Sequence, residues 1–262
     1  MAYINQDNFD WDQTNVDVVL FIPNFKRKHL LTPTLQNIKT SLPKDRWLIL
    51  AVNDGVHEDL SGLIEHNLLY FTLERDNPIE RNGCQIRNYV LKRLQSKILA
   101  TRDPEIFIEG GDYFQSVASI DEKTIYRPSS MVELSEPESP KIINNPHIAL
   151  RSLMSRSTHI VTQQNYRAFH AGVAVHTKTM LDIRGYDERF QNGYGWEDVD
   201  MMNRLSQHGC ETFIDKKVDT FHIWHPRRTR FLKTVTDNQN IYNTIRQQNK
   251  VVANTMDSWG EG

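Results

Sequence analysis

The chain has 262 residues, which is enough for one large domain with a substantial core or for two small ones, and we favour one domain. Its 31 basic and 33 acidic residues give a formal net charge of -2, so no overall positive field favours nucleic acid as a partner. No apolar run reaches membrane-spanning length, no signal-peptide pattern opens the sequence, and the two cysteines match no metal or redox spacing, which together predict a soluble, cytoplasmic protein.

Short apolar runs alternate with amphipathic stretches through the first half of the chain. The runs are nearly continuous in apolar residues, which is typical of strands buried on both faces of a parallel sheet. Strands are predicted at 17–23, 47–52, 68–73 and 105–108. Helical spacing of apolar residues predicts helices at 29–41 and about 84–99. This alternation predicts an α/β fold whose sheet is flanked by helices.

Polar residues follow three of these predicted strands. Parallel sheets bind ligands beyond the carboxyl ends of their strands, so the coincidence favours a binding site at that edge. Asn-Asp-Gly by itself is more typical of a turn. The three strand ends read Pro23-Asn24, Asn53-Asp54-Gly55 and Glu109-Gly110-Gly111-Asp112.

The middle of the chain has weaker periodicity. Residues 113–165 contain several prolines and clustered glutamates, and we interpret them as a loop-rich insertion that either covers an acceptor site or has no function. A strand at 171–175 and a short helix at about 178–183 follow.

A glycine-broken aromatic loop then leads into two adjacent carboxylates. The loop contains Tyr194, Gly195 and Trp196, and glycine lets a ligand approach the main chain while aromatic rings offer flat faces that suit sugars. A helix is expected from Glu197 onward, and Gly209 is a plausible end for it.

The acids of this helix differ in their expected neighbours. Asp198 heads the apolar stripe, so its carboxylate is predicted to point inward. Asp200 and Arg204 have the spacing of an ordinary helical ion pair, which indicates a structural role for Asp200. Acids in a first turn can also do no more than complement the helix dipole.

A late segment, residues 218–225, is predicted to be extended because a proline follows it. Extended geometry would place His222 and His225 on opposite faces, so a shared ion is not expected. One histidine could complete a carboxylate metal site of a kind compatible with Mn²⁺, although a hydrogen-bonded core histidine is the commoner case. Basic clusters at 26–28 and 227–233 could meet a diphosphate or could be surface charge.

The order of these motifs resembles the inverting glycosyltransferases of family 2 type, which have the GT-A fold, and the second half resembles the galactosyltransferase C-terminal module. The matching segments are 21–30, 53–55, 83–88, 185–190, 193–200 and 221–226. This resemblance implies a single domain over residues 1–262 with a Rossmann-like, mixed and mostly parallel sheet. Its expected parts are a nucleotide-sugar half at about 17–112, the insertion at 113–165, an acceptor and catalytic half at 166–225 and a C-terminal tail at 226–262.

The resemblance also implies an activity and a set of roles. The activity would be transfer of a sugar, of galactose or N-acetylhexosamine type, from a UDP-sugar to a hydroxyl of a glycan or another acceptor. Asp198 would be the catalytic base and Glu197 would hold hydroxyls. Donor contacts are expected at Pro23, Asn24, Arg27, Asp54, Arg87 and Glu109. Acceptor contacts are expected at Tyr194, Gly195 and Trp196.

The metal motif departs from the family pattern. The family places Asp-x-Asp after its fourth strand, but the residues aligned there are Glu109-Gly110-Gly111. We predict that Mn²⁺ or Mg²⁺ is held by Asp112 and His222, with Glu109 and His225 as further candidates. The alternatives are glycines that only make a tight turn, a metal held weakly or not at all, and a non-catalytic module that binds a nucleotide-sugar or carbohydrate.

Overall fold

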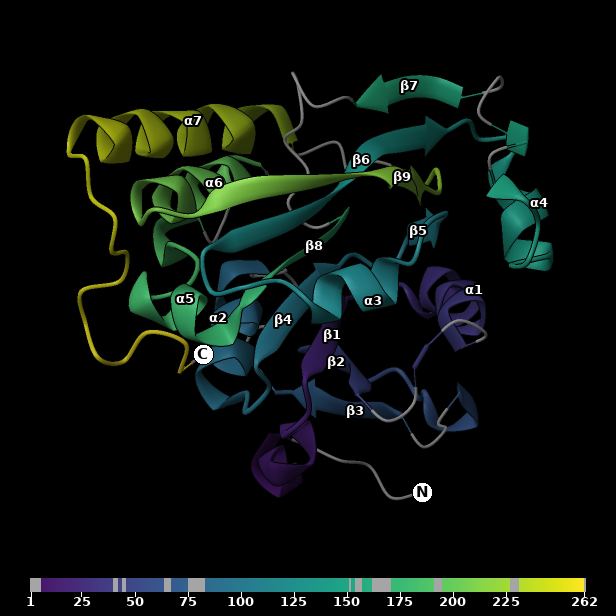
Figure 1. The fold of residues 1–262 in the computed structure, drawn as a ribbon, viewed down its shortest axis with the longest axis horizontal. Helices are drawn as coiled ribbons and strands as arrows, with labels where there is room; N and C mark the ends of the chain where they lie inside the picture. The colour runs from purple at the N-terminus through teal and green to yellow at the C-terminus, as the bar shows by residue number, and fades with distance from the viewer. Residues whose placement is uncertain are drawn as a thin grey trace.

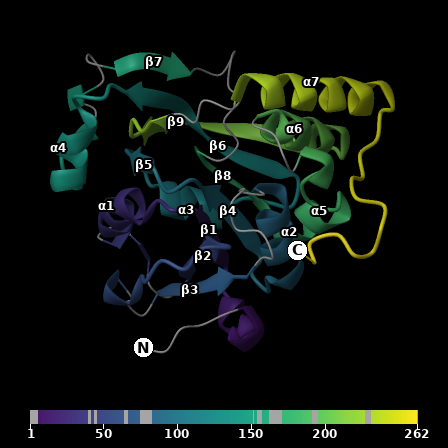
Figure 2. The same cartoon turned by 180° about the vertical axis from the view of Figure 1, so that it is seen from behind.

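The computed structural model describes residues 6–39, 42–43, 46–63, 67–74, 83–150, 152–153, 157–161, 171–190, 195–226 and 231–261. Within them one nine-stranded sheet has the order β3-β2-β1-β4-β8-β6-β9-β5, with β7 paired to β6 (Figure 1). Helices cover both faces of this sheet (Figure 2). The predicted α/β fold with a mixed sheet is confirmed.

The first half of the chain forms the parallel part of the sheet. Its strands run in register, with Val18 level with Trp47 on one side and with Ile98 on the other. All four carboxyl ends therefore meet at one edge. The strands are β1 (Val18–Asn24), β2 (Trp47–Asp54), β3 (Leu68–Leu73) and β4 (Ile98–Arg102).

The second half extends the sheet with mixed pairing. Strand β8 is antiparallel to β4, β6 and β9 are parallel to each other, and β5 is antiparallel to β9. The carboxyl end of β9 is thereby brought beside β5 and the end of β4. The strands are β5 (Ile106–Glu109), β6 (Thr124–Leu134), β7 (Ser157–Val161), β8 (Ala171–His176) and β9 (Glu211–His222).

The helices fall into two layers because side chains alternate across each strand. Val19 and Phe21 of β1 enter one core cluster, whereas Leu20 and Ile22 enter the other. The first cluster packs against α2 (Gly83–Arg93), α5 (Thr177–Asp182), α6 (Glu197–Gln207) and α7 (Phe231–Gln247). The second packs against α1 (Lys28–Lys39) and α3 (Tyr113–Ala118).

A smaller core lies where α4 (Ser139–Asn144) packs beside β5, β6 and the end of β9. Short 3-10 helices lie at Gln6–Asn8, Trp11–Thr14, Ser61–Leu63 and Glu188–Phe190.

The predicted helix at 84–99 was too long. Helix α2 ends at Arg93, and Ile98–Arg102 forms β4, a fully buried strand parallel to β1. Leu91, Leu94 and Ile98 have helical spacing, so the helical pattern continues past the end of α2 and into β4. The strand predicted at 105–108 exists as β5, but it follows β4 and is not parallel to the first-half strands.

The expected loop-rich insertion at 113–165 contains an internal strand of the sheet. Strand β6 pairs with β7, β8 and β9. Its Pro128 lies at a register shift against β9, where a missing N–H is tolerated. The proline that suggested a loop therefore marks a bulge.

Helix α7 lies within what was expected to be a C-terminal tail at 226–262, and it runs alongside α6 (Figure 1). None of the helices in the described ranges is both long enough and apolar enough to cross a membrane.

Candidate active site

The carboxyl end of β4 carries two acids in a tight turn, Asp103-Pro104-Glu105. The Ile106 amide donates to the Asp103 carbonyl across 3.1 Å and closes the turn. Glu105 is 2% exposed, so the turn places a carboxylate inside the protein. A buried carboxylate needs partners of opposite charge or a bound cation.

Three cationic or polar side chains converge on Glu105. Its Oε1 atom lies 3.2 Å from His225 Nε2 and 3.7 Å from His222 Nε2, and Arg27 Nη1 also contacts it. One ligand atom from Glu105, His222 and His225 can be chosen so that all lie within 4.8 Å of one another. Glu105 Oε2 is buried and has no hydrogen-bond partner among the described residues. These features are those of a candidate cation site.

The charge state of Glu105 follows from this environment. Burial alone would raise the pKa of its carboxyl, but hydrogen bonds from His222 and His225 and the positive charge of Arg27 outweigh it. The pKa of Glu105 is therefore held well below its ordinary value. The carboxylate is ionised at neutral pH and can act as a metal ligand.

The ends of β1 and β2 lie in the same edge and are buttressed by an acid that sequence analysis missed. Glu58 Oε2 accepts from Asn24 Nδ2 at 2.7 Å and from the Arg27 backbone amide at 3.0 Å. Asn24 Nδ2 also donates to Asn53 Oδ1 at 2.8 Å. Glu58 thus fixes the loop that carries Arg27. Its partners come from a distant strand, so its role had no signal in the sequence.

The other predicted donor residues of the first half are placed around this edge. Pro23 is level with Val52 in the ladder between β1 and β2. Asp54 is 1% exposed at the last position of β2, and Gly55 follows with a φ of 73°. Arg87 on α2 is also buried, and its Nη2 pairs with Asp103 Oδ1 at 3.0 Å.

Arg87 links the β4 turn to Tyr186. Its guanidinium lies 5.6 Å from the centre of the Tyr186 ring. Burial raises the pKa of the Tyr186 phenol; Arg87 opposes this rise, while the nearby charges of Glu197 and Asp103 add to it. Arg87 therefore contacts both Asp103 and one buried ring.

The aromatic loop leads into α6 through left-handed backbone. Gly195 and Trp196 have φ angles of 78° and 75°. The Gly195 carbonyl accepts from Asn238 of α7 at 2.9 Å, and the Trp196 ring lies 5.0 Å from that of Tyr242. Helix α7 thus holds the two described residues of the predicted acceptor loop. Tyr194 lies outside the described residues.

Asp198 and Asp200 of α6 differ in burial and in hydrogen-bond partners, as the sequence indicated, but Asp198 is not where it was expected. Asp200 and Arg204 are both 2% exposed and paired at 2.7 Å, which confirms a structural ion pair. Asp198 is half-buried, and its Oδ1 accepts from the Val199 amide at 2.8 Å. The fully buried stripe contains Asp200, Met201, Arg204 and Leu205, so Asp198 lies beside that stripe and not at its head.

The predicted metal residues after β5 are elsewhere. Glu109 is opposite Asp219 in the β5–β9 ladder, and the carboxylate of Asp112 caps α3 by accepting from the Gln115 amide at 3.2 Å. Gly110 and Gly111 have positive φ, and a Cβ on Gly111 would lie 2.8 Å from Val218. The glycines make a tight turn, and neither acid belongs to the group formed by Glu105 and the two histidines.

The histidines were expected on opposite faces, and the structure corrects this. Strand β9 ends at His222, so alternation no longer applies at His225, and the two rings lie 5.2 Å apart on one carboxylate. Asp103 and Glu105 were missed because β4 was not predicted: its first two residues were assigned to the helix at 84–99, and Glu105 was assigned to the start of a strand. Their acid-x-acid spacing after a strand was the signal that could have identified them.

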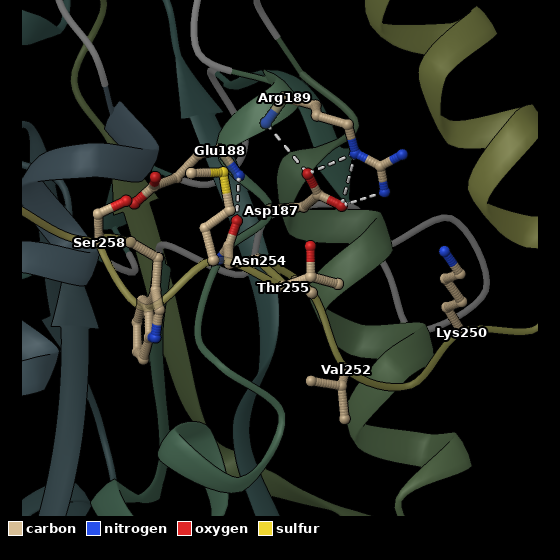
Figure 3. A pocket seen from close by; sticks show the side chains of 11 residues that line it. Asp187, Glu188, Arg189, Lys250, Val252, Asn254, Thr255 and Ser258 are labelled. Carbon is tan, nitrogen blue, oxygen red and sulfur yellow. Dashed lines mark hydrogen bonds and ion pairs between the residues drawn. The ribbon is translucent and has the colours of Figure 1, made fainter.

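A separate cavity of about 430 Å³ lies between residues 187–189 and the C-terminal segment (Figure 3). Asp187 pairs with Arg189 at its rim, and the Glu188 amide donates to Asn254. Glu188 Oε1 accepts from Asn88 and from the Gly260 amide, which ties the segment to α2. No residue predicted for catalysis or binding lines this cavity.

Comparisons with known proteins provide evidence on the fold. A family model described as the N-terminal domain of galactosyltransferase matches residues 151–228, in the second half of this chain. A mannosyltransferase from Pyrobaculum calidifontis in complex with GDP-Man and Mn²⁺ is similar in structure, with a TM-score of 0.56 and 12% identity over 88% of this chain and 64% of that one. TarS of S. aureus in complex with UDP gives a TM-score of 0.54 and 15% identity over 79% and 60%.

The chain thus spans less than two thirds of the length of these structural relatives. The chain has the GT-A glycosyltransferase fold, with a galactosyltransferase-like region in its second half.

Proposed function

We propose that this chain is an inverting glycosyltransferase that moves a sugar from a nucleotide-diphosphate sugar, with UDP as the expected nucleotide, to an acceptor hydroxyl. The observation that carries the proposal is the convergence of Glu105, His222 and His225 at the carboxyl end of β4. That edge is where α/β sheets bind ligands.

The residues present fit a divalent cation. Glu105 offers an ionised carboxylate with one oxygen that lacks a hydrogen-bond partner among the described residues, and His222 and His225 offer imidazole nitrogens. Mixed carboxylate and imidazole ligands are compatible with Mn²⁺. We propose Glu105 and His222 as the protein ligands, with His225 as a third. Such an ion would stabilise the negative charge of the departing diphosphate.

The protein's own groups would do the remaining work. Asp54 and Asn24 would hold the nucleoside, Arg87 would keep the Asp103 turn in place, and Arg27 would add positive charge near the diphosphate. Asp198 would take the proton of the acceptor hydroxyl while that oxygen attacks the anomeric carbon and the bond to the diphosphate breaks.

Replacement of the proposed base tests this mechanism. Base catalysis contributes about 10²–10⁴-fold, so Asp198→Asn should fold normally and transfer sugar at least about a hundredfold more slowly. Asp182→Asn removes a half-exposed acid at the end of α5 and is the matched control. Near-normal transfer by Asp198→Asn would reject the assignment of the base.

The donor can be identified by thermal stability. A nucleotide-sugar that binds the folded state raises the melting temperature by mass action. A panel of UDP- and GDP-sugars, each with and without Mn²⁺, should show one preferred donor whose effect depends on the metal. The acceptor can then be sought with that donor in turnover assays.

The binding-module alternative was motivated by a missing second acid at residues 109–111. Asp103 and Glu105 now stand after the strand that is parallel to β1, which removes that motivation. If every donor that binds is neither hydrolysed nor transferred, the chain is better described as a non-catalytic binding module.

A further inference from the structure

A second cavity is lined by residues of α1 and α3, by Arg102 and by the turn that follows β5. Its volume is about 150 Å³, and Arg102, Ile108, Gly110, Gly111 and Asp112 are among the residues that line it. Each water in the liquid occupies about 30 Å³, so the cavity has room for a small polyatomic ligand.

Arg102 is the unusual member of this lining. It is 1% exposed, and its Nε donates to the Ile106 carbonyl at 2.5 Å. Its Nη2 is also buried, but it has no hydrogen-bond partner among the described residues. No carboxylate in the described part of the chain lies within ion-pair distance of the guanidinium. Burial lowers the pKa of Arg102 to about 10, so it is still charged at neutral pH.

Burying a guanidinium without a counter-charge destabilises the folded state. The Nη2 group of Arg102, which has no partner among the described residues, can donate to an oxyanion. We infer that this cavity binds a small oxyanion, with inorganic phosphate as the simplest example, through Arg102. Asp112 lines the same cavity with an opposing negative charge, and it moderates the affinity.

The position of the cavity gives the bound anion an effect on the proposed active site. The guanidinium that would hold the anion also donates to the Ile106 carbonyl, directly after Glu105. A bound anion would therefore hold Arg102, and through it the Asp103–Glu105 turn, in place. This last step rests on the proposed function, whereas anion binding does not.

Calorimetry with inorganic phosphate tests the site. The titration uses the full chain without divalent ions, at constant ionic strength. One phosphate should bind per chain, and Arg102→Gln should weaken the affinity at least about tenfold because charge-assisted hydrogen bonds are lost. Asp112→Asn retains a capping oxygen and removes the opposing charge, so it should strengthen binding several-fold. Arg46→Gln, which removes a surface arginine paired with Asp17, should change nothing.

The donor edge could also attract phosphate, and Arg27→Gln separates the two sites. Affinity that survives in Arg27→Gln and is lost in Arg102→Gln supports the inference. The reverse result overturns it and leaves the proposed function intact, because the phosphate would then occupy the donor edge. If Arg102→Gln does not fold, Asp112→Asn decides, and an unchanged affinity in that variant rejects the site. Absence of saturable binding to the wild-type chain rejects it as well.

Discussion

Two acidic segments follow each other closely in this chain, Asp103-Pro104-Glu105 and Glu109-Gly110-Gly111-Asp112, and they have different surroundings. Glu105 is buried against His222, His225 and Arg27. Asp112 is exposed and caps a short helix, while Glu109 lies in an antiparallel ladder. The difference shows that the spacing of acids in the sequence does not by itself determine how deeply they are buried or which groups they pair with. The strand that precedes the acids, and the elements that it meets in space, decide their chemistry.

The comparison predicts its largest effect at Glu105. Glu105→Gln should reduce metal-dependent sugar transfer by roughly a hundredfold or more, because a neutral amide is a poor ligand for a hard cation and leaves Arg27 without its partner. Glu109→Gln makes the same chemical change in the other segment and should keep most of the activity. Transfer assays over a range of Mn²⁺ concentrations measure both variants. Equal losses of activity in Glu105→Gln and Glu109→Gln would show that the two acidic segments do not differ in their role.

A smaller effect is expected from the histidine side of the site. His222→Ala should weaken Mn²⁺-dependent UDP binding by at least roughly 10–100-fold, because loss of a group that only orients a metal ligand already has an effect of that size. His208→Ala is the matched control, because His208 lies at the end of α6 near Asp182. Calorimetry that shows unchanged binding for His222→Ala would reject His222 as a ligand.

The glycine turn should respond in stability and not in metal affinity. Gly111→Ala would force a side chain into a left-handed conformation, with its Cβ 2.8 Å from Val218, and should lower the free energy of unfolding by about 1–3 kcal/mol. Gly62→Ala, which meets no atom within 4 Å, should change it by less than about 0.5 kcal/mol. Chemical denaturation measures both. A loss of Mn²⁺ affinity in folded Gly111→Ala would show that this turn belongs to the metal site.

The smallest effect is expected at Asp112. Asp112→Ala removes the cap of α3 and should cost about 1 kcal/mol of stability. Its Mn²⁺ affinity should equal that of the wild-type chain, as judged by calorimetry. A large drop would restore Asp112 as a metal ligand.

Much of the fold could be predicted from local patterns. The strands at β1, β2, β3 and β8 and the start of α6 follow from apolar runs and helical spacing. The errors share one cause, since each needed knowledge of the partners in space. Ile98 continues a helical period but belongs to a strand, and Pro128 looks like loop but lies at a bulge.

Some residues of the candidate site could also be predicted from local patterns, and others could not. Asp54, Arg87 and His222 could be proposed from motifs because each lies in or directly after a recognisable element. Glu105 could not, because β4 was not predicted and Glu105 was assigned to the start of a strand at 105–108. Glu58 could not either, because only the folded chain brings it to the β1 loop.

Anomalous diffraction from crystals soaked with Mn²⁺ and UDP tests the central claim most directly. The structure predicts a manganese peak beside Glu105 and His222, at the carboxyl end of β4. A peak beside Glu109 and Asp112, with none at Glu105, would contradict it.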